Sequence, residues 1–384
     1  MSSARIFWSW LLIVGLIAWL PFRSMGADEP AAGPPRIQLA ILLDTSNSMD
    51  GLINQARTHL WKIVNEFATA KRGGKSPELQ VALYEYGKSS LPAEGGFIRQ
   101  VVPFTVDLDK VSKELFDLKT NGGDEYCGWV IEHAVDNLQW SNQPKDLKCI
   151  FIAGNEPFTQ GPKDFHKSCK AAADKGITVS TIFCGDNSEG IRTSWMEGAK
   201  LADGTYVSIN QNEVLPAIVA PQDKELEKLS GELNKTYLAY GKAEARQRFA
   251  ENQVAQDANA AKAAPGAAQL RANVKASGLY KNSDWDLVDG LKDGTLKKLE
   301  ELKEDELPDE LKKLKPEERK AFVEAKAKAR GELQEKIKAL HQAREQYVNA
   351  ELQKVRAGGA NTLDKAIIDA VRKAGSSKDF EFVK

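Results

Sequence analysis

The apolar positions of residues 36–210 form six short runs that alternate with amphipathic stretches. Several runs are continuously apolar and rich in β-branched residues, as expected for strands covered on both faces. Such alternation is typical of βαβ units, so we predict an α/β fold with a doubly wound, mostly parallel six-stranded sheet. The predicted strands are Ile37–Leu43, Leu79–Tyr86, Phe97–Phe104, Leu147–Ala153, Ile177–Cys184 and Thr205–Ile209. The predicted helical stretches are 51–70, 107–118, 125–139, 164–175 and 191–202.

The second and third runs are predicted to form a hairpin. Only the segment GKSSLPAEGG separates them, and its Gly, Ser and Pro residues are typical of a loop. A loop this short joins antiparallel neighbours, so we expect one antiparallel strand at the edge of the sheet.

Residues 217–384 follow a different pattern, in which Lys, Glu, Ala and Leu dominate. A long amphipathic helix is predicted to begin at Pro316, because proline suits the first helical position and Glu317 and Glu318 favour the positive end of the helix dipole. Its apolar residues recur at steps of three and four, and this stripe must be buried against neighbouring helices, a second copy of the chain or a partner. The stripe contains Phe322, Ala325, Ala329, Leu333, Ile337, Leu340, Tyr347, Leu352 and Val355.

The first 26 residues have the pattern of a targeting segment. Arg5 precedes the apolar run Ile6–Leu20, which is short for a bilayer span. Ser24 and Gly26 occupy the −3 and −1 positions of a cleavage site, as in a signal peptide. The alternative is an uncleaved anchor, since the tryptophans of the run favour the membrane interface. Both interpretations predict export, to the periplasm or out of the cell, with membrane attachment only if the segment is uncleaved.

These patterns divide the chain into a leader, a linker and two larger regions. An Ala-rich stretch broken by Pro265 and Gly266 is predicted to be a flexible joint within the second region. The predicted division is a leader over 1–26, a linker over 27–35, an α/β domain over 36–216 and a helical region over 217–384, with the joint near 256–268.

The balance of charges along the chain argues against one class of function, the binding of nucleic acid. Lys and Arg total 53 and Asp and Glu total 54, which gives a net charge of −1. The chain therefore lacks the cationic surplus that proteins use to hold nucleic acid by bulk electrostatics, and no nucleic-acid partner is predicted.

The four cysteines, Cys127, Cys149, Cys169 and Cys184, show no C-x-x-C spacing. In an oxidising compartment they could pair in three ways, so a disulfide of unknown pairing is one interpretation. The other is that they are free and pack as small apolar residues.

The segment after the first predicted strand carries the strongest chemical signal. It reads Asp44-Thr45-Ser46-Asn47-Ser48 and precedes a long helix. Ligands of open parallel sheets bind just beyond the carboxyl ends of strands, and one carboxylate with two hydroxyls suits a hard cation such as Mg²⁺ or Mn²⁺. The alternative is that Ser46 and Ser48 only satisfy the N-terminus of the helix.

The ILLDTSNSM segment, the order of the elements and the later GGDE segment resemble the von Willebrand factor A domain with its metal-ion-dependent adhesion site. The resemblance covers residues 36–212. It implies a Rossmann-like sheet with a metal at its top, and a ligand that completes the metal shell with a carboxylate of its own. It assigns Asp44, Ser46 and Ser48 to the first metal loop.

The other two loops depart from the family pattern. A threonine of the second loop contacts the metal in the family; alignment on the glycines places Asp124 there, and Thr120 is the nearest threonine. The third loop, usually T-D-G-x-P, reads Ala153-Gly154-Asn155-Glu156-Pro157, so Gly154 replaces the acid and Asn155 or Glu156 could compensate. The site is therefore either a working one with a rearranged acid or a partly degenerate one.

No catalytic residue is predicted. Cys127 and His133 are six residues apart on a predicted helix, which places them on roughly opposite faces. The other histidines, His59, His166 and His341, have no partners at metal-ligand spacing.

We therefore interpret the chain as an exported, non-enzymatic binding protein. Its predicted partner is a protein with an exposed carboxylate, and Asn47, Glu125 and Glu156 are expected to face that partner. The main alternative is an envelope scaffold, in which the C-terminal helices self-associate and the metal site is degenerate. A hydrolase that uses Cys127 or Glu156 is a third hypothesis.

Overall fold

The computed structural model describes residues 34–209, 218–355 and 363–382. The predicted leader and most of the predicted linker lie outside these residues. None of the described helices is both long enough and apolar enough to cross a membrane.

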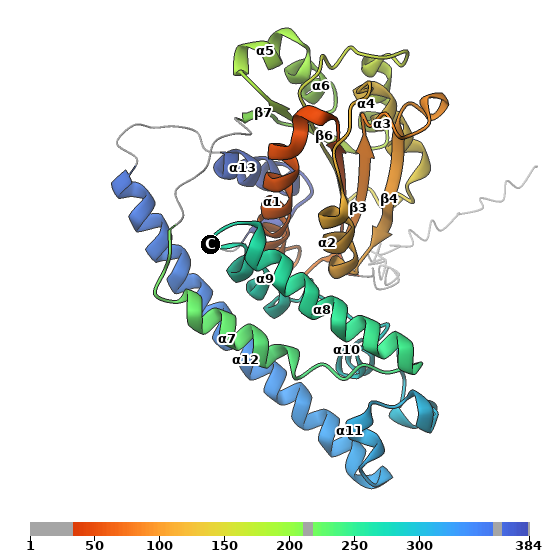
Figure 1. Ribbon diagram of the computed structural model, residues 1–384, viewed down its shortest axis with the longest axis vertical. Helices are drawn as coiled ribbons and strands as arrows, with labels where there is room; N and C mark the ends of the chain where they lie inside the picture. Colours follow the sequence, from red (N-terminus) through yellow and green to blue (C-terminus); the bar gives the residue numbers. More distant parts are fainter. Residues whose placement is uncertain (1–33, 210–217, 356–362, 383–384) are drawn as a thin grey trace, which may run out of the picture. The chain divides into compact units, whose positions relative to one another are not determined.

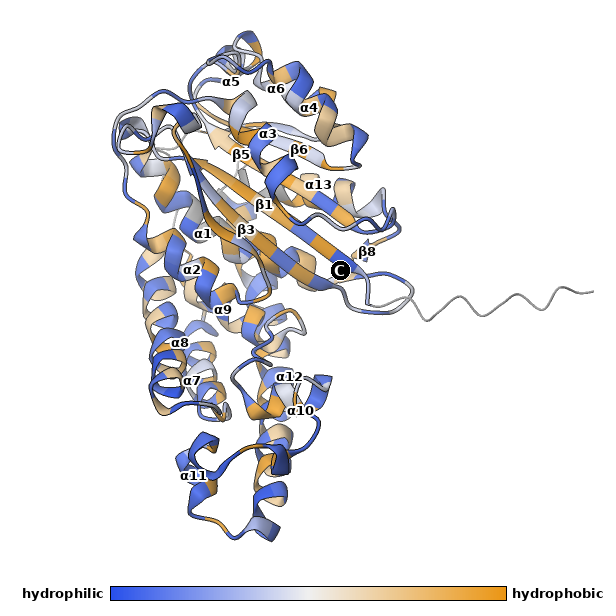
Figure 2. Ribbon diagram, turned by 90° about the vertical axis from the view of Figure 1, so that its right-hand side faces the viewer, coloured by the Kyte–Doolittle hydropathy of each residue, from blue (hydrophilic) through white to orange (hydrophobic). Residues whose placement is uncertain are grey.

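A six-stranded sheet forms the centre of the α/β part, with the strand order β4-β3-β1-β5-β6-β7. All neighbouring strands are parallel except β3 and β4, which confirms the doubly wound sheet and the antiparallel edge hairpin. The strands appear as largely apolar ribbons in Figure 2, because both faces of the sheet are covered. The strands are β1 (Arg36–Asp44), β3 (Glu78–Tyr86), β4 (Ile98–Thr105), β5 (Leu147–Gly154), β6 (Thr178–Cys184) and β7 (Tyr206–Ile209).

Side chains of β1 alternate between two hydrophobic layers. Leu39 and Ile41 pack with α1 and α2, whereas Ala40 and Leu42 pack with α3, α4 and α6 on the other face. The period of two in a strand therefore decides which helices each residue contacts. The helices of this part are α1 (Asp50–Ala68), α2 (Leu108–Asp117), α3 (Cys127–Asn137), α4 (Phe165–Asp174), α5 (Asn187–Arg192) and α6 (Trp195–Leu201). Short elements are η1 (Asn47–Met49), β2 (Ala70–Lys71) and η2 (Ala93–Gly95).

Neighbouring helices of the chain cover the middle of the predicted apolar stripe, whereas Ala325 and Tyr347 are exposed. Ile337 of α12 is fully buried and packs, with Leu333 and Leu340, against apolar residues of α7 and α9. Figure 1 shows α7 lying along α12. Neighbouring helices, one of the three coverings that the sequence left open, therefore cover this part of the stripe. The elements are α7 (Asp223–Asn234), α8 (Ala243–Ala263), α9 (Ala267–Ala276), α10 (Leu287–Asp293), η3 (Leu299–Glu301), η4 (Glu304–Glu306), α11 (Asp309–Lys312) and α12 (Pro316–Val355).

The predicted joint near 256–268 is the end of α8, a short turn and the start of α9. Ala260 and Ala267, on either side of the turn, are both fully buried. Gly266 adopts a φ of 89° at this turn, a conformation that favours glycine. The segment is therefore a packed helix–turn–helix connection here, and its flexibility stays a prediction.

The last helix, α13 (Leu363–Ser376), and β8 (Glu381–Phe382) return to the sheet. Val371 and Phe380 are buried in the same core as β1 and α1, and β8 pairs antiparallel with β2. Figure 1 shows α13 beside α1, and Arg372 forms an ion pair of 2.6 Å with Glu66 of α1. The packing thus differs from the predicted division at residue 216, because the end of the chain completes the α/β core.

All four cysteines are free and buried. Cys149 and Cys184 lie in strands, and Cys127 and Cys169 lie in α3 and α4. The structure therefore contains the four thiols as packing residues, and none is joined in a disulfide.

Candidate functional site

The loop after β1 gathers oxygen atoms at the carboxyl end of the sheet. Asp44, the last residue of β1, is fully buried, and its Oδ1 accepts a hydrogen bond of 2.7 Å from the backbone N–H of Ser46. The hydroxyls of Ser46 and Ser48 lie 3.2 Å apart, and Ser48 donates to Oδ1 of Asn155 at 3.5 Å. The first loop and the third loop therefore meet at this point.

Local backbone bonds fix the shape of this loop. The N–H of Thr45 donates to the carbonyl of Tyr86 on β3, and the N–H of Met49 donates back to the carbonyl of Ser46. Ser46 precedes the η1 turn but makes no capping hydrogen bond with its side chain. Its hydroxyl instead faces the oxygen cluster, which is not what the helix-capping alternative predicts for this serine.

Glu125 of the second loop reaches the same cluster. It is only 5% exposed, and its side chain lies close enough to Ser46 and Asp44 for both to influence its pKa. Gly87, directly after β3, makes room for this approach: a Cβ there would lie 2.6 Å from Cγ of Glu125 and 2.9 Å from Oδ1 of Asp44. The N–H of Glu125 donates to Oε1 of Gln160 at 2.8 Å, which holds the backbone in place.

Two carboxylate oxygens of this cluster, Asp44 Oδ2 and Glu125 Oε2, are buried and have no hydrogen-bond partner among the described residues. Burial raises the pKa of Asp44, and burial together with the negative charge of Asp44 raises the pKa of Glu125. The charge of Glu156 raises both pKa values further. Two adjacent buried carboxylates cannot both ionise at low cost unless a cation or a proton lies between them.

The donor set fits a hard divalent cation. Two carboxylates and two hydroxyls converge, and oxygen ligands of this kind suit Mg²⁺ or Mn²⁺ better than softer metals. Among the described residues no three His, Cys, Asp or Glu side chains form a metal-binding group. The cluster differs from such a group because serine hydroxyls supply half of its donors.

Position 154 of the third loop has no room for an acidic side chain. A Cβ on Gly154 would lie 2.5 Å from the hydroxyl oxygen of Tyr86, 3.1 Å from the ring of Trp195 and 3.2 Å from Cβ of Asp44. The Tyr86 hydroxyl is itself fixed by donating to the carbonyl of Ala153 at 3.0 Å. Glycine at position 154 is therefore a steric requirement of this packing.

The structure brings together some predicted site residues and separates others. Asp44, Ser46, Ser48 and Asn155 lie in one cluster, and the half-buried Glu156 is close enough to act on it by charge. The two second-loop candidates lie elsewhere: Asp124 is exposed and accepts from the Tyr126 hydroxyl, and Thr120 donates to Asp50. Asn47 is exposed.

Glu125, expected to face a partner, is the second-loop member of the cluster. Alignment on the glycines selected its neighbour Asp124, because the sequence alone does not show which of two adjacent acidic residues points inward. The position of Glu125 two residues before the buried start of α3 was the available signal.

The hydrolase hypothesis gains no geometric support. Sγ of Cys127 lies 3.7 Å from the Tyr86 hydroxyl in the core, and burial raises the pKa of this thiol well above its ordinary value. The ring of His133 instead packs edge-on against Tyr84. A thiol that stays protonated is a poor nucleophile.

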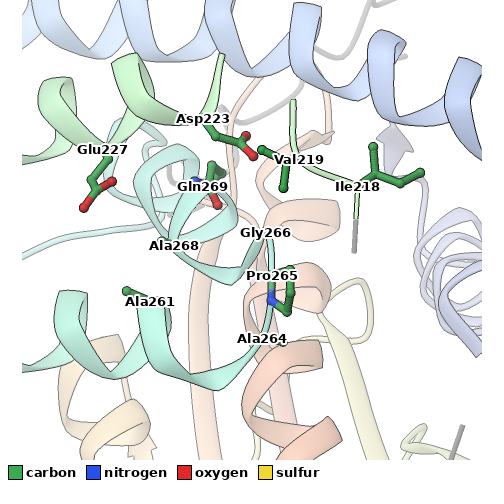
Figure 3. Close-up of a pocket in the computed structure, with 10 residues that line it drawn as sticks. All are labelled: Ile218, Val219, Asp223, Glu227, Ala261, Ala264, Pro265, Gly266, Ala268 and Gln269. Atoms are coloured by element: carbon green, nitrogen blue, oxygen red, sulfur yellow. The ribbon is translucent and has the colours of Figure 1, made fainter. Parts of the chain in front are cut away.

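A separate cavity of about 230 Å³ lies in the helical region (Figure 3). Small residues of α8 and α9 line it, together with Ile218, Val219 and the polar side chains of Asp223, Glu227 and Gln269. Asp223 is paired with Arg344 at 2.6 Å. The cavity shares no residue with the cluster at β1.

A family model matches most of the α/β part of the chain. The family model described as the von Willebrand factor type A domain matches residues 38–195. A search of curated proteins finds no match.

Several solved structures are similar at low identity. Proximal thread matrix protein 1 from the mussel byssus, with a zinc-occupied MIDAS motif, is 12% identical with a TM-score of 0.36, covering 47% of this chain and 43% of that chain. The SpRpn10 VWA domain is 17% identical with a TM-score of 0.35, covering 45% and 88%. BatB from Bacteroides thetaiotaomicron is 16% identical with a TM-score of 0.35, covering 57% and 98%. The chain thus spans less than half the length of the mussel protein.

Proposed function

The chain contains a von Willebrand factor type A domain at residues 38–195, and we propose that this domain binds a protein partner through a divalent cation at the carboxyl end of β1. Domains of this family are generally interaction modules without catalytic activity. The observation that carries the proposal is the pair of buried, unpartnered oxygens, Asp44 Oδ2 and Glu125 Oε2, beside the Ser46 hydroxyl. Buried polar atoms normally have partners, so this pair calls for a ligand.

The chain's own residues have separate roles in this proposal. Asp44, Glu125, Ser46 and Ser48 would hold Mg²⁺ or Mn²⁺, and Asn155 would orient Ser48. When bound, the cation supplies positive charge and coordination positions that oxygen atoms of a partner can fill. The surrounding loops, 44–51, 120–126 and 154–162, would contact the neighbouring surface of the partner. The resemblance to the family implies that the partner contributes a carboxylate.

We place this activity outside the cytoplasm. The support comes from the sequence pattern of the first 26 residues, which predicts either a signal peptide or an anchor. The protein would therefore be periplasmic or secreted, and membrane-attached only if that segment is retained.

Metal titration tests the proposal directly. Mn²⁺ and Mg²⁺ are titrated calorimetrically into the full chain, the Asp44→Asn variant and the Asp124→Asn variant. We expect one site in the wild type, a loss of affinity of more than about tenfold in Asp44→Asn, and wild-type binding in Asp124→Asn, since affinity follows the charge of the ligands. Asp124 is a matched control because it belongs to the same loop but is exposed. The absence of binding to the wild type would overturn the proposal.

A further inference from the structure

We infer that Glu125 supplies, from the second loop, the carboxylate that position 154 of the third loop cannot hold, and that the cation is therefore completed by a neutral oxygen of the partner, a hydroxyl or a peptide carbonyl. This inference rests on the proposed function and deepens it. It differs from the acidic partner group that the family resemblance implies.

The first step is that no acid can stand at position 154. The Tyr86 hydroxyl and the Trp195 ring occupy the space that any side chain there would need. Both of these side chains are fully buried, and Trp195 Nε1 donates to the carbonyl of Glu156 at 2.8 Å. The third loop therefore offers the cluster the amide of Asn155 and no carboxylate at the position next to Asp44.

The second step is that Glu125 is built into the cluster. Its backbone is held by Gln160, its side chain passes against Gly87, and it is as inaccessible as the core around it. Gly87 has a φ of 81°, so any other residue would be strained as well as in collision with Glu125. A glutamate that only faced a partner would lie on the surface and would not need the space that Gly87 leaves for the side chain of Glu125.

The third step is the balance of charge. The two carboxylates of Asp44 and Glu125 together neutralise a divalent cation. The half-buried Glu156 adds negative charge close enough to act on both, and the exposed Asp50 and Asp124 follow in the flanking loops. Lys88 of the adjoining loop shares Glu85 with Arg99, so these three side chains carry a net charge of +1, against three negative charges on Glu156, Asp50 and Asp124.

A carboxylate from a partner would thus enter an environment that already has an excess of negative charge. Like charges placed together at an interface cost binding energy, whereas a hydroxyl or carbonyl brings an oxygen ligand without a charge. The site therefore favours a partner segment that presents Ser, Thr or backbone oxygen to the cation.

The experiment uses Mn²⁺ as the probe, followed by electron paramagnetic resonance on the full chain. We compare the wild type with Glu125→Gln, Glu125→Ala and the control Asp124→Ala. We expect Mn²⁺ affinity to fall more than about tenfold in both Glu125 variants and to stay unchanged in Asp124→Ala. Thermal unfolding in EDTA confirms that each variant is folded.

Added acetate then tests the charge argument. In Glu125→Ala, acetate is expected to restore Mn²⁺ affinity, whereas acetamide, its neutral counterpart, is not. In the wild type, acetate is expected to leave the Mn²⁺ spectrum unchanged. Wild-type Mn²⁺ affinity in Glu125→Gln, or binding of acetate to the wild-type Mn²⁺ complex, would overturn the inference while leaving the proposed function intact. A wild type that binds no Mn²⁺ would overturn the proposed function itself.

Discussion

Arg271 of α9 and Asp109 of α2 form an ion pair of 2.6 Å in which the two side chains are only 1% and 6% exposed. The pair links the helical region to the α/β part. Arg271 also pairs with Asp257 of α8 and lies over the ring of Trp61 of α1, and the Tyr280 hydroxyl donates to Asp109. A buried charge with this many partners cannot be removed without leaving other charges unpaired.

We expect Arg271→Met to lower the free energy of unfolding by about 3 kcal/mol or more, because Asp109 would stay buried without its cation. The measurement is urea unfolding of the full chain. The control is Lys113→Met, which breaks the exposed pair with Asp117 and should cost about 0.5 kcal/mol or less. Equal effects of the two substitutions would show that the buried pair does not hold the regions together.

Gly154→Ala is expected to destabilise the protein by about 1–3 kcal/mol, the usual cost of overpacking. The new methyl group would stand 2.5 Å from the Tyr86 hydroxyl oxygen. The double variant Gly154→Ala/Tyr86→Phe removes the colliding atom and should recover part of the loss. Thermal unfolding of the two single variants and the double variant measures this coupling; simple additivity would contradict the steric argument.

We expect the pKa of His166 to lie above the ordinary value for histidine and the pKa of His133 to lie below it. Hydrogen bonds with Asp164 and then Glu197 raise the pKa of His166, whereas burial lowers the pKa of His133. Since the pKa of His166 is raised in the folded state, its contribution to stability is present below the unfolded pKa and is lost as the pH rises through the folded pKa. NMR titration checks both directions. Asp164→Asn should lower the pKa of His166 and leave His133 unchanged.

Ile337→Ala should cost about 2–5 kcal/mol, because this fully buried residue joins α12 to α7 and α9. Tyr347→Ala, on the exposed part of the same helix, should change stability by about 0.5 kcal/mol or less. Chemical denaturation compares the two variants. If the apolar stripe instead mediated self-association, Tyr347→Ala would change the sedimentation coefficient of the full chain. Ile337→Ala would then have little effect on the stability of the monomer.

The sheet could be predicted because continuous apolar runs report burial directly, and β1 and β5 are such runs. The meeting of Asp44, Ser46 and Ser48 at one point could be predicted because they follow a buried strand at fixed spacing, and their binding of a metal stays a prediction. The second loop could not, because Asp124 and Glu125 are chemically equivalent neighbours and only the backbone direction before α3 decides which one points inward. The packing of α13 in the α/β core could not be predicted either, because its amphipathic pattern does not show which core its apolar face joins.

The packing of α13 against α1 determines which segments a shortened form of the protein must retain. Expression of residues 36–216 alone would strip Val371, Ala374 and Phe380 from the layer over α1 and expose an apolar seam to water. Excision of the intervening helices would in turn remove Ala260 and Val274 from the same core and leave Asp109 buried without Arg271. The core over α1 is accordingly assembled from three distant stretches of the polypeptide.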